Sequence, residues 1–406
     1  MVAELFMKLV KYDTQSDSKS ETYPSTAKQM DFAKVVAEEC RTIGLSEVNV
    51  DKFGYVTATL PSNLPAGKTA PTIGFLAHMD TSPDASGENV KPRVVKSYDG
   101  GDIALNERIS LSPSEFPTLK NYVGQDLIVT DGNTLLGGDD KAGIAAILAA
   151  MAKLIADPSI PHGKIRVAFT PDEEIGRGVN HFDVPGFGCE FAYTLDGGEI
   201  GEIVTESFNA SEAKFIVTGK SVHPGTAKGV MINAALIAGE IISAFPSSGE
   251  TPATTENYEG FYHLCNVTGE VEKAELIYIL RDHDPAILKK REDFVTALAK
   301  KLNDKYGEGT VALEITEQYR NMDEILKEKP EITQIAKDAI VEAGITPVVQ
   351  PIRGGTDGSR LTFMGLPCPN IFAGYHNAHG PYEYVPIPSL EAAVQVVVNI
   401  AKAVVK

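Results

Sequence analysis

Cysteine is scarce in this chain of 406 residues, which contains only four cysteines. They are scattered along the sequence, at Cys40, Cys189, Cys265 and Cys368. No two of them form the Cys-x-x-Cys pair that is typical of zinc–thiolate sites and redox motifs. The pattern argues against a disulfide framework and favours a reducing compartment. We therefore expect the protein to be cytoplasmic.

Basic residues are also few. The chain has 37 lysines and arginines but 55 aspartates and glutamates, which gives a net charge of −18. Nucleic acids and anionic membranes are bound through basic patches, so neither is an expected partner. No apolar run is long enough to span a bilayer. The N-terminal stretch MVAELFMKLVKYDTQSDS indicates a short amphipathic helix rather than a signal peptide.

What the sequence does contain is an alternation of strand-like and helix-like segments over residues 1–207 and again over residues 320–406. Near-continuous apolar runs such as KIRVAFT and EFAYTL are typical of strands that are buried on both faces. The alternation predicts an α/β fold, with a mixed, mostly parallel sheet flanked by helices. Between these parts, residues 208–319 combine half-polar strands with amphipathic helices, which predicts an inserted α+β domain.

Acidic and histidine side chains follow several of the predicted strands at the point where each strand ends. In open α/β sheets, ligands bind beyond the carboxyl ends of the strands, so we expect these side chains to meet at one site. The clusters are His78 with Asp80, Asp139 with Asp140 ahead of an apolar helix, Glu173 with Glu174, Asp196, and His376 with His379.

Each cluster taken alone has an ordinary structural explanation, such as helix capping for Asp139 and Asp140 or a solvated loop for Glu173-Glu174. Together, however, several carboxylates at one sheet edge would repel each other and raise their pKa values, a cost that a divalent cation removes. Histidines and carboxylates without a thiolate suit Zn²⁺, Mn²⁺ or Co²⁺, with zinc the default. The residues alone leave open which acid of each pair, and which histidine, would be a ligand.

Seven motifs, in their order along the chain, resemble the M20 metallopeptidases, and within that family the tripeptide aminopeptidases most closely. They run from about residue 78 to residue 384, so the resemblance covers most of the chain. It implies a zinc-peptidase-like α/β catalytic domain made of residues 1–207 and 320–406, with an inserted lid or dimerisation domain at residues 208–319. The motifs are LAHMDTSP, GGDDKAG, TPDEEIGRG, LDGG, SVHPG, RGGTDGSR and HNAHGPYEYV.

Carried over position by position, the resemblance implies two Zn²⁺ ions per subunit, with Mn²⁺ or Co²⁺ as substitutes. His78 and Asp196 would bind one ion. Glu174 and His379 would bind the other, and Asp140 would bridge the two.

The same resemblance implies roles around the metal ligands. Asp80 would orient the His78 ring, and Glu173 would be the general base that takes a proton from the attacking water. His223 of SVHPG, in the inserted domain, would donate a hydrogen bond to the growing oxyanion, from its own chain or across a dimer. Apart from the resemblance, a histidine beside a Pro-Gly turn is more often an ordinary surface residue.

A short peptide also presents a free C-terminal carboxylate, for which arginine is the natural partner. Arg353 of RGGTDGSR is the first candidate, because its neighbouring glycines allow close approach. Arg281 and Asn233, in the inserted domain, are further candidates, although either could be purely structural.

The expected function is therefore metal-dependent removal of the N-terminal residue from tripeptides. A dipeptidase or an N-acyl-amino-acid deacylase of the same family would share the metal ligands and stays open as an alternative. A non-catalytic calcium-binding protein is a more distant one, because calcium prefers all-oxygen ligands and the histidines count against it. The resemblance also allows a homodimer through the inserted domain, and the sequence does not decide between monomer and dimer.

Overall fold

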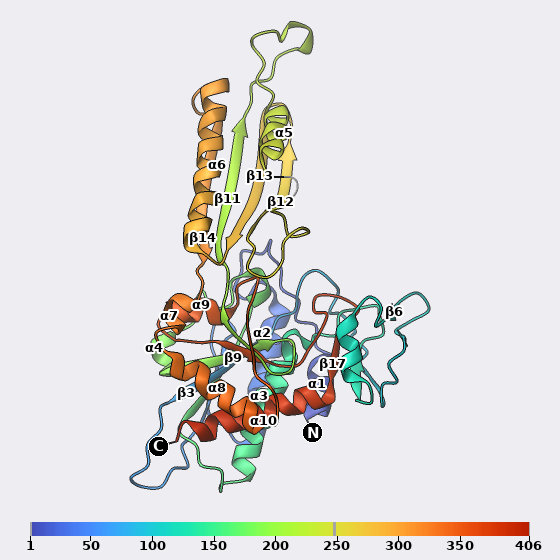
Figure 1. Ribbon diagram of the computed structural model, residues 1–406, viewed down its shortest axis with the longest axis vertical. Helices are drawn as coiled ribbons and strands as arrows, with labels where there is room; N and C mark the ends of the chain where they lie inside the picture. Colours follow the sequence, from blue (N-terminus) through green and yellow to red (C-terminus); the bar gives the residue numbers. More distant parts are fainter. Residues whose placement is uncertain (1, 247–248, 406) are drawn as a thin grey trace. The chain divides into compact units, whose positions relative to one another are not determined.

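The computed structural model describes residues 2–246 and 249–405. The chain divides into two compact units (Figure 1). Unit 1 comprises residues 1–205, 324–350 and 356–406, and unit 2 comprises residues 206–323 and 351–355. The sequence places the insertion at residues 208–319, and it assigns residues 351–355 to the last part of the first domain rather than to unit 2.

Unit 1 is built around an eight-stranded sheet with the strand order β1-β2-β8-β3-β9-β16-β10-β15. The neighbouring strands β8, β3, β9 and β16 run parallel to one another, while β1, β2 and β10 pair in the antiparallel sense. The predicted α/β class with a mostly parallel central sheet is therefore confirmed. The strands are β1 (Ser46–Val50), β2 (Val56–Leu60), β8 (Ile165–Thr170), β3 (Ile73–His78), β9 (Phe191–Gly197), β16 (Asn370–Phe372), β10 (Glu202–Glu206) and β15 (Val348–Pro351).

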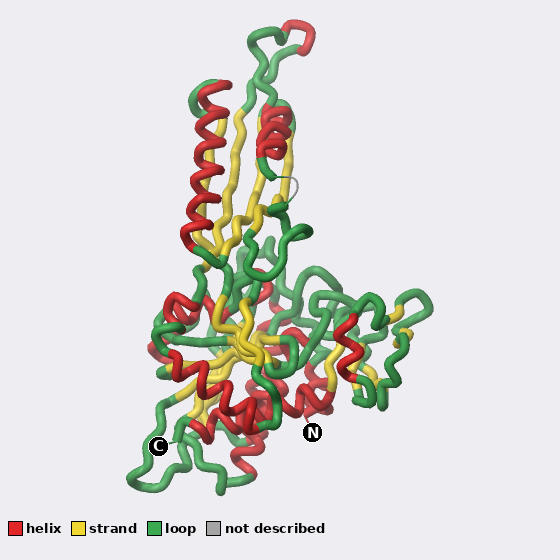
Figure 2. Tube along the Cα trace, in the orientation of Figure 1, coloured by secondary structure: helices red, strands yellow, loops and turns green. Residues whose placement is uncertain are grey.

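Helices cover both faces of this sheet (Figures 1 and 2). Successive strand residues point to opposite faces, so Phe75 of β3 packs into the larger core and Leu76 into a smaller one. On the larger-core side lie α1 (Val2–Leu9), α2 (Ala27–Ile43), α3 (Gly138–Ala156), α8 (Pro330–Glu342) and α10 (Ile387–Ala403). The opposite side is covered by α4 (Val184–Phe187) and α9 (Asp357–Phe363).

The stretch between β3 and α3 forms a small subdomain of unit 1 with its own hydrophobic core. Its strands pair in the order β17-β7-β4, so the chain's late strand β17 joins two early ones. Its elements are β4 (Arg93–Val95), β5 (Ile103–Ala104), β6 (Ser110–Leu111), the 3-10 helix η1 (Pro117–Tyr122), β7 (Leu127–Val129) and β17 (Tyr384–Pro386).

Unit 2 is an antiparallel sheet with the order β12-β13-β11-β14 and two helices packed on one face. Strand β12 lies inside the first expected strand–helix–strand unit, between its helix and its second strand, and the sequence does not predict it. Its pattern offered little signal, since most of its residues are exposed at the sheet edge. The elements are β11 (Asn209–Thr218), α5 (Ala234–Ala244), β12 (Phe261–Gly269), β13 (Lys273–Asp282), α6 (Pro285–Tyr306) and β14 (Val311–Tyr319), with a short α7 (Asp323–Leu326) at the return to unit 1.

Within the described ranges, none of the helices is both long and apolar enough to cross a membrane.

Candidate metal centre

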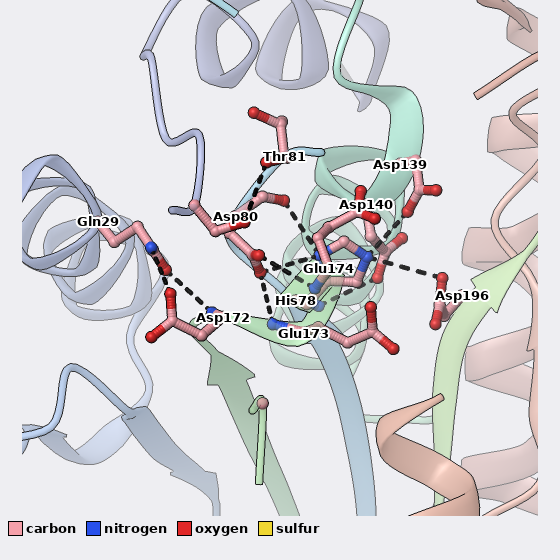
Figure 3. A network of polar contacts seen from close by, with 12 residues as sticks. Gln29, His78, Asp80, Thr81, Asp139, Asp140, Asp172, Glu173, Glu174 and Asp196 are labelled. Atoms are coloured by element: carbon pink, nitrogen blue, oxygen red, sulfur yellow. Dashed lines mark hydrogen bonds and ion pairs between the residues drawn. The ribbon is translucent and has the colours of Figure 1, made fainter. Parts of the chain in front are cut away.

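The clusters predicted at strand ends do meet at one edge of the unit 1 sheet (Figure 3). Because β8, β3 and β9 are parallel neighbours, their carboxyl ends lie side by side. His78 is the last residue of β3, Glu173 and Glu174 follow β8, and Asp196 lies near the end of β9. The sheet order thus explains why residues more than 100 positions apart become neighbours.

Two overlapping groups of potential metal ligands share His78. One consists of His78, Asp140 and Asp196, and the other of His78, Asp139 and Glu174, with the ligand atoms of each group within 4.8 Å of one another. The His78 Nε2 atom lies 2.8 Å from Asp139 Oδ1 and 3.7 Å from Asp196 Oδ1. A single buried imidazole is therefore surrounded by carboxylates.

Asp139, rather than Asp140, has its carboxylate between the two histidines. Its Oδ1 lies 2.8 Å from His78 Nε2, and its Oδ2 lies 3.4 Å from His379 Nε2. The Asp140 carboxylate instead accepts backbone hydrogen bonds from His78 (3.1 Å) and Gly143 (3.2 Å). Both acids have non-helical backbone angles at the start of α3, so their side chains point in different directions. The geometry thus differs from the bridging role that the motif resemblance implies for Asp140.

His379 is the histidine of HNAH that reaches the cluster. Its Nε2 lies 3.0 Å from Glu174 Oε2, and its Nδ1 lies 3.3 Å from Asp84 Oδ2. His376 points elsewhere, with its Nε2 2.7 Å from the Tyr122 hydroxyl. Burial lowers the pKa of the half-buried His376 to about 4, so the ring is neutral near pH 7.

Asp80 contacts both the His78 ring and the loop after β8. Its backbone carbonyl lies 3.0 Å from His78 Nδ1, and its carboxylate lies 3.4 Å from the same nitrogen. The two carboxylate oxygens also accept the backbone N–H groups of Glu173 (2.9 Å) and Glu174 (3.1 Å) (Figure 3). One buried side chain therefore fixes the tautomer of a histidine and the backbone that carries two glutamates.

The electrostatics of the cluster favour a bound cation. Burial, reinforced by neighbouring negative charges, raises the pKa of Asp196 to about 8 and that of Glu174 to about 7. Burial alone would lower the pKa of His78, but hydrogen bonds with Asp139 and Asp80 raise it well above its usual value. Glu174 Oε1 is buried and has no hydrogen-bond partner among the described residues. Crowded carboxylates with an unsatisfied oxygen fit a divalent cation, which would neutralise their repulsion and supply the absent partner.

Glu173 borders this cluster, but its carboxylate makes no hydrogen bond within the described part of the chain. Burial and the charge of Asp196 raise the pKa of Glu173 well above its usual value. Its position depends on the backbone, which is held by Asp80. A carboxylate with a raised pKa and no fixed partner is suited to accept and release a proton.

Two residues beside the cluster were not singled out from the sequence. The Tyr375 hydroxyl donates a hydrogen bond of 2.9 Å to Asp196 Oδ1. Asp357, at the start of α9, is buried, and its Oδ2 has no hydrogen-bond partner among the described residues. Burial raises the pKa of Asp357 to about 6, and its charge contributes to the raised pKa of Glu173. Both lie inside or next to the quoted motifs, but their residue types alone carried no signal.

The candidate residues for oxyanion and substrate contacts belong to unit 2. His223 is exposed, and its Nδ1 accepts the backbone N–H of Gly225 at 3.1 Å. Asn233 caps α5, where its side chain accepts the N–H of Leu236 at 3.3 Å. These two contacts are local and hold a turn and a helix end.

The two candidate arginines, Arg281 and Arg353, have different partners. Arg281 is buried and donates to Gln318 Oε1 at 2.7 Å and to the backbone of β13 and β11, which is a structural use. Arg353 donates to Thr255 Oγ1 at 2.7 Å and lies over the rings of Phe208 and Phe261, each centroid 5.6 Å away. Among the described residues no acid pairs with Arg353, so its charge is available to an anion.

Comparisons with known proteins agree with the architecture. Residues 130–403 match the sequence model of peptidase family M20/M25/M40. The chain is 54% identical to Peptidase T of Caldanaerobacter subterraneus subsp. tengcongensis and 53% identical to Peptidase T of Clostridium botulinum, in both cases over 99% of this chain and 98% of the relative.

Solved structures give the same picture. Aminopeptidase PepT from Bacillus cereus superposes with a TM-score of 0.74 at 25% identity, over 99% of this chain and 98% of that one. A dinuclear metal binding peptidase of the M20 family from Bacillus subtilis, at 13% identity and a TM-score of 0.65 over 99% and 96% of the two chains, shows the same fold.

Proposed function

The chain belongs to peptidase family M20/M25/M40, and we propose that it is a metal-dependent aminopeptidase that removes the N-terminal residue from tripeptides. The observation that carries this proposal is the Asp139 carboxylate, which lies between His78 and His379 at 2.8 Å and 3.4 Å. That spacing suits one carboxylate shared by two cations. Full-length relatives named Peptidase T, at 53–54% identity, support tripeptides as the substrate class.

The proposed ligands divide into two sets that share Asp139. His78 and Asp196 would hold one cation, and Glu174 and His379 the other. Asp139 replaces Asp140 as the proposed bridge because only its carboxylate approaches both histidines. Zinc is the proposed metal, with manganese or cobalt as substitutes, because two imidazoles and three carboxylates form a borderline donor set without thiolate.

When bound, the cations would supply Lewis-acid polarisation of the scissile carbonyl and of the attacking water. The chain itself supplies the proton transfers. Glu173, with its raised pKa, would take the water proton and pass it to the leaving amine. Asp80 would keep this carboxylate in place through the Glu173 backbone and would orient the His78 ring at the same time.

Two further roles are proposed for residues of unit 2. Arg353 would bind the C-terminal carboxylate of the peptide, since its guanidinium is held by Thr255 and has no acidic partner among the described residues. His223 would donate to the growing oxyanion, either within its own subunit or from a second copy. The assignment of Asn233 and Arg281 to substrate binding stays a prediction.

A comparison of substrates tests the reaction. Purified enzyme would be given di-, tri- and tetrapeptides, a tripeptide amide and an N-acetyl amino acid, and kcat/KM would be measured for each. The proposal expects the tripeptide acid to be hydrolysed best and the amide poorly. Preferred hydrolysis of the dipeptide or the N-acetyl amino acid would favour a dipeptidase or a deacylase instead.

The proposal also covers the oligomeric state of the protein and its cellular compartment. We propose a homodimer formed through unit 2, where the edge strand β12 and the helix α5 present exposed apolar residues such as Val267 and Leu236. Sedimentation of the purified protein would test it. A reducing compartment such as the cytoplasm suits the chain, since all four cysteines are free thiols.

A further inference from the structure

Glu383 is a buried carboxylate that has no part in the mechanism above. Only 1% of the residue is exposed. Its Oε2 accepts the backbone N–H groups of Leu136 and Gly137, each at 2.7 Å, and its Oε1 accepts the N–H of Asp139 at 2.9 Å. A single side chain therefore binds three backbone N–H groups around the start of α3, including that of the proposed bridging residue.

The same residue belongs to the segment that carries His379. That segment is a closed loop, because His376 and Tyr384 exchange two backbone hydrogen bonds of 2.9 and 3.1 Å at its base. Glu383 is the residue next to Tyr384, at the foot of the loop. It thus joins the turn of Asp139 to the loop of His379, although these lie some 240 positions apart in the sequence.

The backbone also packs closely against Glu383 at Gly138. A Cβ atom added at Gly138 would lie 2.8 Å from Tyr375 Cβ and 3.0 Å from Glu383 Oε1. The glycine therefore lets the turn close around the carboxylate, and the three N–H groups converge on it.

We propose that Glu383 is a positioning residue that sets the separation of Asp139 and His379. It would thereby set the metal affinity of the second metal position, the one proposed to be held by Asp139, Glu174 and His379. The inference rests on the proposed two-metal site. Glu383 is not among the proposed metal or substrate ligands; it would act by holding the backbone of one proposed ligand, Asp139, from the loop that carries another, His379. Replacing a residue that hydrogen-bonds to a metal ligand typically weakens the protein's affinity for that metal by roughly 10–100-fold.

Glu383→Gln is the sharpest test, because it keeps the size of the side chain. An amide has one acceptor oxygen, and its NH₂ group would face backbone N–H groups that can only donate. At least one of the three hydrogen bonds is then lost, and the Asp139 turn is released. Asn399→Ala is the matched control, since it removes a buried 2.9 Å hydrogen bond to the Ala339 carbonyl in unit 1, away from the metal ligands.

The measurement is calorimetric titration of the metal-free proteins with Co²⁺, together with the visible absorption spectrum of the cobalt ions. Wild type and Asn399→Ala should bind two ions with the same affinities and spectra. Glu383→Gln should keep the first ion and bind the second roughly 10–100-fold more weakly, with an altered spectrum. Two ions bound by Glu383→Gln with wild-type affinities would overturn the inference alone, whereas a wild type that binds fewer than two would overturn the proposed site.

Hydrogen exchange in the unaltered protein keeps the proposal testable if Glu383→Gln does not fold. The amides of Leu136, Gly137 and Asp139 should exchange slowly in metal-free wild type, because Glu383 holds them without help from the cation. Exchange of these amides at the rate of free peptide would show that Glu383 does not hold the turn, and the proposal would fall.

Discussion

Gln29 and Asp172 exchange two hydrogen bonds across 143 positions of sequence (Figure 3). The Gln29 amide donates to Asp172 Oδ1 at 2.7 Å, and its oxygen accepts the Asp172 backbone N–H at 3.0 Å. Asp172 has a left-handed backbone conformation, with φ of +56°, and directly precedes the proposed general base Glu173. A side chain of α2 therefore holds the backbone that leads into the turn of Glu173 and Glu174.

Gln29→Leu should weaken both the fold and the reaction. It leaves the buried Asp172 N–H group without its partner, at a cost of about 1–3 kcal/mol, and it removes one of the two hydrogen bonds to Asp172 Oδ1, whose other donor is the Ser25 hydroxyl. We expect the free energy of unfolding in urea to fall by about 2–4 kcal/mol. In the protein that remains folded, kcat should fall by roughly 10–100-fold, because Glu173 is displaced. Lys34→Ala, on the exposed face of α2, is the control and should change stability by less than about 0.5 kcal/mol. Wild-type kcat for Gln29→Leu would confine Gln29 to a structural role.

Glu173 and Glu174 should be separable by substitution. Glu173→Gln should keep both metal ions while kcat falls by roughly 10²–10⁴, since the proton acceptor is lost. Glu174→Gln should lose metal, because it removes a ligand that lies 3.0 Å from His379. Elemental analysis and steady-state kinetics on the same samples would check both. The opposite pattern would mean that the two roles are exchanged.

Asp139→Asn should remove more metal than Asp140→Asn. The first substitution neutralises the carboxylate that lies near both His78 and His379, whereas the second alters a side chain that accepts the backbone N–H groups of His78 and Gly143. Metal content after dialysis would be compared at equal protein concentration. Loss of both ions from Asp140→Asn, with both retained by Asp139→Asn, would restore Asp140 as the bridge.

The metal-free protein should lose stability as the pH rises from about 5 to 7. In the native state the pKa values of Glu174 and Asp196 are raised to about 7 and about 8, while unfolded carboxyls titrate near 4. The native state therefore holds more protons than the unfolded state in this window, and stability falls by about 1.4 kcal/mol per pH unit for each extra proton. Bound cations take the place of these protons, so the stabilisation by metal should grow with pH. Urea unfolding with and without a chelator would measure both trends. A metal-free protein that becomes more stable over this range would contradict the sign.

His223→Ala should fold and bind metal normally but lower kcat by roughly 10²–10³, as loss of an oxyanion donor does. Among the described residues its side chain hydrogen-bonds to the local Gly225 N–H alone, so the substitution should cost little stability. Mixing Glu173→Gln with His223→Ala subunits under exchange conditions distinguishes two arrangements. Recovered activity would mean that the histidine acts across a dimer, and a silent mixture would mean that it acts within its own chain. Full turnover by His223→Ala alone would leave it an ordinary surface residue.

The fold class and the location of the candidate site at one edge of the sheet follow from the order of residues along the chain. Alternating apolar segments specify a parallel sheet, and the acids and histidines after those segments must then meet at its carboxyl edge. His78, Glu174, Asp196 and His379 are brought together there, as their positions after the strands and the motif resemblance implied.

The different contacts of neighbours such as Asp139 and Asp140 appear only in the folded chain. Adjacent residues have the same local signal, and their side-chain directions depend on backbone angles at the start of α3 that the surrounding contacts impose. The sequence likewise gives no signal for the roles of Gln29 and Glu383, because glutamine in a helix and glutamate before a strand are common. They became meaningful when packing placed a buried polar group opposite backbone donors that had no other partner.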